Sequence, residues 1–122
     1  MPFEYRARVK RVVDGDTVIM DVDLGFGIWI HDQSFRLLGI NTRERSQPGG
    51  VEAAAYLATV LRAAPEVTVT SVKNDKYGGR YDARVALPDG RDLSTLLIEE
   101  GRAAPWKGSG AKPLPVWPRS TS

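Results

Sequence analysis

The N-terminal part of the chain alternates apolar and polar residues, and this alternation most limits the folds open to it. Residues 17–24 place an apolar side chain at every second position, which is the period of a strand with one buried face. The same period runs through residues 3–10 and, with an interruption near Asp32, through residues 28–38. Three successive strands joined by short turns imply an antiparallel meander.

Beyond residue 50 the period changes from that of a strand to that of a helix. An apolar stripe predicts an amphipathic helix that Pro65 ends; its members are Ala53, Leu57, Val60, Leu61 and Ala64. Residues 67–72 and 81–87 predict two further strands, and residues 93–97 predict a short helix capped by Asp92. This order is typical of the OB-fold, an α+β, mainly β architecture in which a five-stranded barrel carries a helix between strands 3 and 4 and a C-terminal helix.

The distribution of proline divides the chain into one domain and a tail. A chain of 122 residues suits a single hydrophobic core, and we place this domain in residues 1–104. Residues 105–122 contain four of the eight prolines and predict an extended, Pro-rich C-terminal tail rather than a packed element. We expect Trp106 and Trp117 to hold this tail against the domain.

The composition excludes several classes of site. The chain contains no cysteine and one histidine, which excludes disulfides, thiolate metal sites and His-rich zinc centres. Any bound metal would therefore have oxygen ligands. The histidine, His31, lies in a predicted strand, where a lone histidine is more often a surface or core residue than a catalyst, and we assign it no role. The net charge of +2 only weakly indicates a polyanionic partner.

The N-terminal sequence Met-Pro-Phe-Glu-Tyr-Arg is too polar for a signal peptide, and no apolar run reaches the roughly 18 residues of a membrane span. We therefore expect a soluble, cytoplasmic monomer with no membrane partner. The alternative is a secreted protein from which a signal peptide has been removed.

Asp14, Gly15 and Asp16 stand where the second predicted strand begins. A carboxylate beside a tight glycine turn can bind a hard cation, which takes oxygen ligands from a backbone that bends around it. In the alternative interpretation, the aspartates only accept hydrogen bonds from the backbone of the turn. Arg36 and Arg80 also have two interpretations, as guanidinium ligands of a phosphate or as surface charges.

Four segments of the chain resemble the staphylococcal nuclease (thermonuclease) family. They are residues 13–18 (Val-Asp-Gly-Asp-Thr-Val), 35–44 (Phe-Arg-Leu-Leu-Gly-Ile-Asn-Thr-Arg-Glu), 75–80 (Asp-Lys-Tyr-Gly-Gly-Arg) and 96–103 (Leu-Leu-Ile-Glu-Glu-Gly-Arg-Ala). Each segment alone is a weak signal, but their order and spacing together are specific. The resemblance therefore covers most of the predicted domain.

This resemblance implies a calcium-dependent phosphodiesterase that hydrolyses DNA and RNA, preferably single-stranded, with little sequence preference and leaves 3′-phosphates. The positions that match the family pattern are Asp16, Asn41 and the backbone carbonyl of Thr42 for Ca²⁺, Asp14 for the water around the ion, Glu44 for the attacking water, Arg36 and Arg80 for the phosphate, and Lys76 and Tyr77 for the substrate. Such chemistry suits these residue types, because guanidinium groups and a dication oppose the charge that develops during attack on phosphorus.

The sequence departs from the family pattern at two of these places. Asn41 replaces the usual aspartate and removes one negative charge, and Gly79 adds one residue before Arg80. Arg84 is therefore an alternative to Arg80, although Arg80 directly follows the glycine turn. The alternative function is a nucleic-acid-binding OB module with weak or lost nuclease activity. Such a module has no evident use for Glu44, whose charge opposes the binding of a polyanion.

Overall fold

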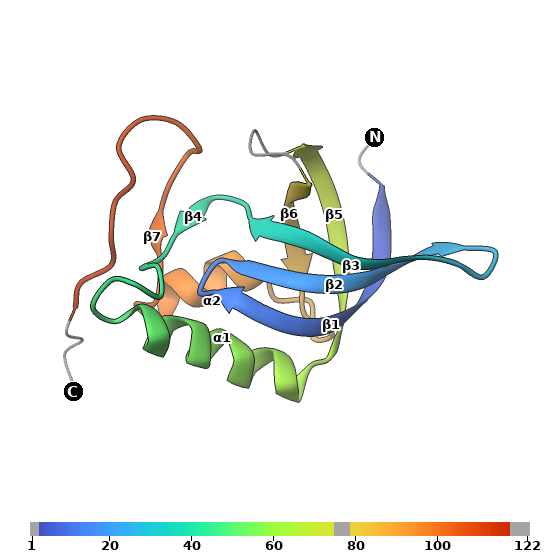
Figure 1. Ribbon diagram of the computed structural model, residues 1–122, viewed down its shortest axis with the longest axis horizontal. Helices are drawn as coiled ribbons and strands as arrows, with labels where there is room; N and C mark the ends of the chain where they lie inside the picture. The colour runs from blue at the N-terminus through green and yellow to red at the C-terminus, as the bar shows by residue number, and fades with distance from the viewer. Residues whose placement is uncertain (1–2, 75–78, 118–122) are drawn as a thin grey trace.

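Five strands close into a barrel in this computed structural model, which describes residues 3–74 and 79–117 (Figure 1). The order around the barrel is β1-β2-β3-β6-β5, and the strands are β1 (Glu4–Asp14), β2 (Thr17–Gly25), β3 (Ile28–Leu37), β5 (Glu66–Asn74) and β6 (Arg80–Ala86). Neighbouring strands are antiparallel except β3 and β6, which are parallel. The predicted OB-fold is confirmed.

β2 and β3 form a long ribbon that extends beyond the barrel (Figure 1). Met20 pairs with Gln33 and Val22 pairs with Ile30, so β3 places two residues opposite one residue of β2. One of the two is Asp32, whose φ is 56°. A bulge of this kind bends a strand and increases its twist. The interruption predicted near Asp32 is therefore confirmed.

Two helices pack against the barrel. α1 (Gly50–Ala63) begins three residues before the predicted stripe, and its buried residues are Gly50, Ala53, Ala54, Leu57 and Leu61. α2 (Leu93–Glu99) has the predicted cap, because the carboxylate of Asp92 accepts a hydrogen bond from the backbone N–H of Thr95 at 3.0 Å. Within the described residues, no helix is long and apolar enough to cross a membrane.

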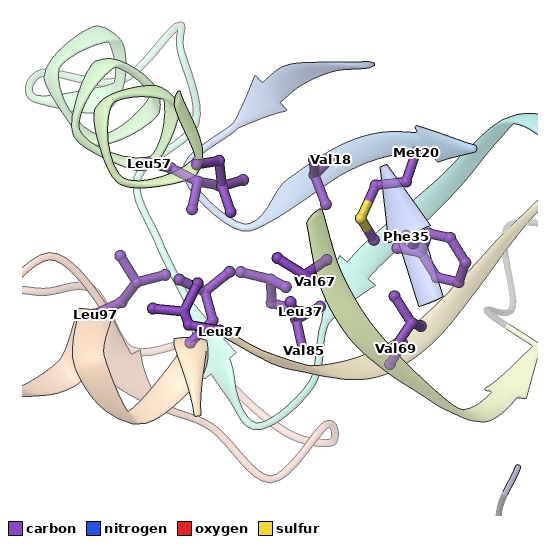
Figure 2. Packing of buried hydrophobic residues seen from close by; sticks show 14 of the residues in the cluster. Val18, Met20, Phe35, Leu37, Leu57, Val67, Val69, Val85, Leu87 and Leu97 are labelled. Atoms are coloured by element: carbon purple, nitrogen blue, oxygen red, sulfur yellow. The ribbon is translucent and has the colours of Figure 1, made fainter. Parts of the chain in front are cut away.

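The hydrophobic core joins the barrel interior to both helices (Figure 2). Leu57 of α1 and Leu97 of α2 point toward side chains of the barrel in this view. The largest fully buried side chains are Met20, Leu37, Ile40, Leu57, Leu93, Leu97, Val18, Val69 and Val85. One core therefore holds the barrel strands and both helices together.

Two short strands outside the barrel correct the expectation of an unpacked tail. β4 (Ile40–Asn41) pairs antiparallel with β7 (Ala104–Pro105), and residues 104–117, named here the C-terminal segment, then loop back past β4 toward the start of α1 (Figure 1). The ring of Trp117 fills the space next to Gly49, where an added Cβ atom would lie 2.5 Å from it. The C-terminal segment is therefore attached to the domain at several points, although most of its residues are exposed, and the predicted anchoring by Trp117 is confirmed.

Candidate active site

The register of β2 and β3 brings Asp16 beside Arg36. Thr17 pairs with Arg36 across the two strands, and the backbone N–H of Leu37 donates to the carbonyl oxygen of Asp16 at 2.8 Å. The Nη2 atom of Arg36 donates to Oδ2 of Asp16 at 3.2 Å, and the hydroxyl of Thr17 donates to Oδ1 at 3.0 Å. Asp16 and Arg36 are each 8% exposed, so they form a buried ion pair.

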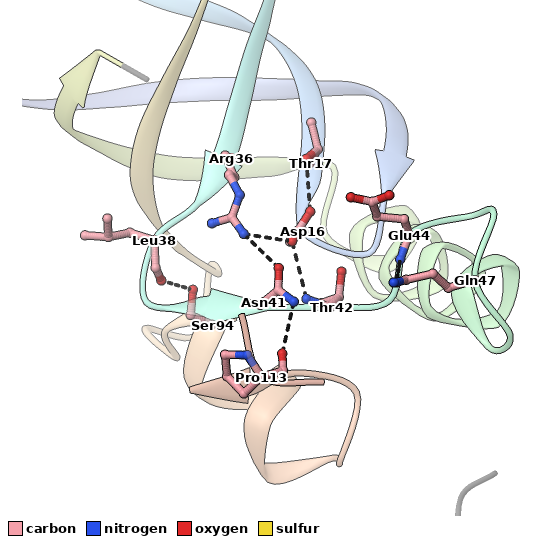
Figure 3. Close-up of polar contacts among 10 residues, drawn as sticks. All are labelled: Asp16, Thr17, Arg36, Leu38, Asn41, Thr42, Glu44, Gln47, Ser94 and Pro113. Carbon is pink, nitrogen blue, oxygen red and sulfur yellow. Dashed lines mark hydrogen bonds and ion pairs between the residues drawn. The ribbon is translucent and has the colours of Figure 1, made fainter. Parts of the chain in front are cut away.

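Asn41 and Thr42 complete this cluster from β4 and the residue after it (Figure 3). Oδ1 of Asn41 accepts a hydrogen bond from the same Nη2 atom of Arg36 at 3.1 Å. The backbone N–H of Thr42 donates to Oδ2 of Asp16 at 3.4 Å. Two oxygens from separate elements, Oδ2 of Asp16 and Oδ1 of Asn41, therefore converge on one positively charged group.

The turn between β3 and β4 fixes the relative positions of Arg36 and Asn41. Gly39 has a φ of 86°, a left-handed conformation that glycine adopts without the strain of a Cβ atom. The hydroxyl of Ser94 in α2 donates to the carbonyl oxygen of Leu38 at 2.8 Å. The backbone N–H of Trp106 donates to the carbonyl oxygen of Gly39 at 2.9 Å. The turn is thus held from two sides.

Glu44 lies in the loop between Asn41 and α1, with an exposed side chain. Its backbone N–H donates to Oε1 of Gln47 at 2.7 Å, and its carbonyl oxygen accepts the N–H of Gln47 at 2.8 Å. Figure 3 shows its carboxylate on the side of the loop that faces Asp16. The loop backbone is therefore ordered, while the carboxylate itself is accessible to solvent.

The residues flanking this cluster bind the backbone. Oδ1 of Asp14 accepts the backbone N–H of Arg45 at 3.2 Å, and the guanidinium of Arg45 donates to the carbonyl oxygen of Val13. The guanidinium of Arg43 donates to the carbonyl oxygens of Pro115 and Pro48. The hydrogen bonds of Arg43 and Arg45 therefore hold chain segments together.

Arg80 begins β6 beside β3. It pairs with Ser34, two residues before Arg36, and paired residues in a parallel ladder point to the same face of the sheet. Arg80 and Arg36 therefore share one face. Arg84 lies further along β6, and its guanidinium forms an ion pair with Asp92 at 3.6 Å. Lys76 and Tyr77, predicted to touch the substrate, lie outside the described residues.

The described residues contain no group of three or more His, Cys, Asp or Glu side chains that could hold a metal. A site for a hard cation would have to use the Asp16 carboxylate with neutral oxygens. One neutral oxygen at this place, Oγ1 of Thr42, is buried and has no hydrogen-bond partner among residues 3–74 and 79–117. His31 lies on the ribbon and forms an ion pair with Asp21 at 3.3 Å when it is protonated.

Trp106 contacts the site, and the sequence did not indicate which residue it would contact. We expected it to hold the tail, and the structure places its ring over the guanidinium of Arg36, with Cζ 5.0 Å from the ring centre. The carbonyl oxygen of Pro113 accepts a hydrogen bond from Nδ2 of Asn41 at 3.0 Å. A tryptophan in a segment rich in proline and glycine signals that this segment packs, but it does not identify the partner.

The comparisons with known proteins identify the family of the chain. A family model described as staphylococcal nuclease homologue matches residues 34–112, which is more than half of the chain. The matched range contains Arg36, Asn41, Glu44 and Arg80, and it reaches into the C-terminal segment. None of the curated proteins matches the sequence. The family match indicates a nuclease-like or nucleic-acid-binding function.

Proposed function

We propose that this chain, which belongs to the family of staphylococcal nuclease homologues, hydrolyses phosphodiester bonds of DNA and RNA with little sequence preference. The observation that carries the proposal is the buried cluster of Asp16, Arg36 and Asn41. Glu44 follows three residues after Asn41, and Figure 3 shows its carboxylate on the side of the loop that faces Asp16. The cluster supplies a guanidinium group and converging oxygens, and Glu44 supplies a base.

Arg36 retains donors that a phosphate oxygen can use. A guanidinium has five N–H donors, and the hydrogen bonds to Asp16 and Asn41 both come from Nη2. Within the described part of the chain, Nε and Nη1 have no hydrogen-bond partner, and neither atom is fully buried. Figure 3 shows Nη1 pointing away from both partners. These donors support the binding of equatorial phosphate oxygens, whose charge grows during in-line attack.

Glu44 is the proposed general base. Its carboxylate is exposed on an ordered loop, which supports contact with a water molecule beside a bound phosphate. A carboxylate at hydrogen-bond distance from the attacking water can take up its proton as the bond to phosphorus forms. We expect the leaving group to be the 5′ oxygen, so that the products carry 3′-phosphates.

The donor set fits a hard dication such as Ca²⁺. Oδ2 of Asp16 and Oδ1 of Asn41 lie 3.2 and 3.1 Å from one nitrogen of Arg36, and convergence of this kind supports a cation bound by Asp16, Asn41 and the backbone carbonyl of Thr42. Bound calcium would polarise a phosphate oxygen. Each of these two side-chain oxygens has a second lone pair beside the one that Arg36 uses, so we expect the ion to bind them without displacing the guanidinium, and Asp14 to act only through water.

We expect single-stranded substrates and little sequence preference, and the arginines of the site support the second expectation. Contacts through phosphate would then dominate, and such contacts carry no base sequence. Arg80 shares a sheet face with Arg36, which supports a second phosphate contact. Lys76 and Tyr77 remain predicted substrate residues.

The second candidate function is a nucleic-acid-binding module without turnover. It is favoured by one observation, the burial of the Arg36 guanidinium between Asp16, Asn41 and Trp106. A buried arginine can stabilise a fold without touching a substrate. The two functions differ in what Glu44 does, because a binding module gains nothing from this negative charge.

Cleavage of labelled oligonucleotides tests the proposal. Single-stranded DNA and RNA of mixed sequence are incubated with the protein and calcium, with a calcium chelator in a parallel reaction, and the product ends are identified by mass spectrometry. We expect cleavage with 3′-phosphate ends that the chelator abolishes. Glu44→Gln should lose cleavage and keep binding, whereas Glu52→Gln, on the exposed side of α1, should behave as the wild type. Binding without cleavage by the wild type would leave the second candidate.

A further inference from the structure

We propose that the C-terminal segment is a wall of the active site and that Trp106 is a positioning residue for Arg36. This inference rests on the proposed function and deepens it, because it names a residue that sets the direction of the phosphate-binding guanidinium. The ring of Trp106 lies over that guanidinium, with 5.0 Å between the Arg36 Cζ atom and the ring centre. A cation above the face of an indole is attracted by the negative charge of that face.

The Trp106 ring is itself held in place. The backbone N–H of Trp106 donates to the carbonyl oxygen of Gly39 at 2.9 Å, and Nε1 donates to the carbonyl oxygen of Ser109 at 3.2 Å. β7 ends at Pro105 and pairs with β4. The ring position is therefore set by the same turn that carries Asn41. This arrangement makes the stacking on Arg36 a fixed feature of the fold.

Asn41 connects Arg36 with the same segment. Its Oδ1 atom accepts a hydrogen bond from Arg36 at 3.1 Å, and its Nδ2 atom donates to the carbonyl oxygen of Pro113 at 3.0 Å. A side-chain amide can do both, whereas an ionised aspartate can only accept. The amide at position 41 thus has a use that an aspartate cannot fill, namely to attach the segment to the guanidinium.

Two more contacts anchor the far part of the segment. The guanidinium of Arg43 donates from Nε and Nη2 to the carbonyl oxygen of Pro115, at 3.2 and 3.0 Å. The ring of Trp117 packs against Gly49, just before α1. The segment is therefore attached near residues 105, 113, 115 and 117. Because the segment is attached at both ends, it cannot move away from Arg36 as a whole and take Trp106 with it.

The consequence for catalysis concerns direction rather than charge. The Nη2 bonds to Asp16 and Asn41 fix one edge of the guanidinium, and Trp106 fixes its plane. The remaining donors then point in one direction. Loss of alignment between a catalytic group and a substrate reduces the rate of the chemical step, by as much as about a hundredfold for a displacement of 1 Å. We therefore expect loss of the Trp106 ring to lower kcat more than it raises KM.

The test compares two substitutions of Trp106 with a matched control. Trp29 is also half-buried and also stacks on an arginine, with Arg8 Cζ 4.8 Å from its ring centre, but it lies on the β2–β3 ribbon. Trp106→Ala should lower kcat by about tenfold or more with a smaller change in KM. Trp106→Phe, which keeps a ring face, should recover most of the loss, and Trp29→Ala should leave kcat unchanged. Wild-type kcat in Trp106→Ala would overturn the inference.

A spectroscopic readout separates this inference from the proposed function. The Nε–H signal of Arg36, assigned by its disappearance in Arg36→Lys, should shift in Trp106→Ala because the ring current is lost, and should return toward the wild-type position in Trp106→Phe. An unchanged signal would overturn the positioning role, whether or not the protein cleaves nucleic acid. A wild type without cleavage, but with this shift, would refute only the proposed function.

Limited proteolysis tests the link through Asn41. Lys107 lies between Trp106 and the glycines of the segment, and trypsin cleavage after it can be followed by mass spectrometry. Asn41→Asp removes the donor to Pro113 and should accelerate this cleavage about threefold or more relative to the wild type, in line with the loss of one hydrogen bond. Trp29→Ala should be cleaved at the wild-type rate. Equal rates for Asn41→Asp and the wild type would show that the amide does not hold the segment.

Discussion

A Cβ atom on Gly50 would lie 1.6 Å from the carbonyl oxygen of Glu44. The first turn of α1 thus touches the backbone of the loop that carries the proposed base, and only glycine leaves room for this contact. Gly50→Ala must move either the helix or the loop, and we expect it to lower the free energy of unfolding by about 3 kcal/mol, the upper end for overpacked sites. Urea unfolding measures this change.

The control for Gly50→Ala is Val51→Ala, one residue further along the same turn. Val51 is 56% exposed, so its truncation should change the free energy of unfolding by less than about 0.5 kcal/mol. The Gly50 variant should also lose activity, because the loop moves with Glu44. A Gly50→Ala protein as stable as the wild type would contradict the close approach.

The second prediction concerns the two arginines that share a sheet face. Arg36→Lys keeps a charge beside Asp16 but loses the planar fork, and Arg80→Ala removes the second guanidinium. We expect each to lower kcat by about a hundredfold, as for the loss of one donor to a developing negative charge. Single-turnover cleavage of a labelled oligonucleotide measures the chemical step directly.

Arg84→Ala is the control for Arg80→Ala. The Arg84 guanidinium is half exposed and is paired with Asp92, so its loss should change kcat less than about twofold. A larger loss at Arg84 than at Arg80 would mean that the extra residue, Gly79, shifts the role of phosphate ligand along β6. A change confined to KM at Arg36 would contradict its role in the transition state.

The third prediction is that Asn41→Asp binds calcium more tightly than the wild type. The amide oxygen and a carboxylate oxygen have the same reach, but the carboxylate adds a negative charge, and affinity in oxygen-ligand sites rises with that charge. We expect the dissociation constant to fall about tenfold, which corresponds to roughly 1.4 kcal/mol. Calorimetric titration compares the two proteins, and equal affinities would show that Asn41 does not bind the ion.

The fourth prediction is a pH dependence of stability that originates at Asp21. The backbone N–H of Asp32 donates to the carboxylate of Asp21 at 2.9 Å. Lys10 forms an ion pair with the same carboxylate, and so does His31 when it is protonated. The N–H of Asp32 first, and then His31 and Lys10, lower the pKa of Asp21 below its ordinary value of 3.8. A lowered pKa stabilises the fold above the unfolded value, and this stabilisation is lost as the pH falls through the folded value.

Asp21→Asn should therefore be less stable than the wild type at about pH 6. The difference should shrink at about pH 3, below the ordinary pKa of 3.8, because the carboxyl group of the unfolded wild type is then largely protonated and the stabilisation of the charged form in the folded state begins to be lost. Urea unfolding at both pH values measures the difference. Asp89→Asn should show the same pH dependence, because the backbone N–H of Arg91 likewise lowers the pKa of Asp89. A difference that grows on acidification would contradict the assignment.

The sequence predicted the barrel well, because alternation and helical spacing are local signals. The bulge at Asp32 and the cap at Asp92 both follow from residue type, and the structure has both. The first turn of α1 was missed because Gly49 and Gly50 precede the apolar stripe and favour a loop. β7 was missed because its second residue is Pro105, which lacks the N–H that a strand normally donates.

The site could be predicted only in part. The resemblance to the staphylococcal nuclease family implied that Asp16, Arg36 and Asn41 belong to one site, and the structure brings them together. That one guanidinium nitrogen takes up both oxygens depends on the register of β2 and β3, which periodicity does not specify. The contact between Trp106 and Arg36 spans 70 residues of chain, and no local pattern encodes a pairing at that distance.

The hydrogen bond between Asn41 and Pro113 also sets an order of events during synthesis. The chain leaves the ribosome N-terminus first, and the elements that hold Asp16, Arg36 and Asn41 all precede β5. The ring and the carbonyl oxygen that cover these residues belong to positions 106 and 113. On the ribosome, a nascent chain therefore carries its arginine uncovered until residues 106 and 113 have left the exit tunnel.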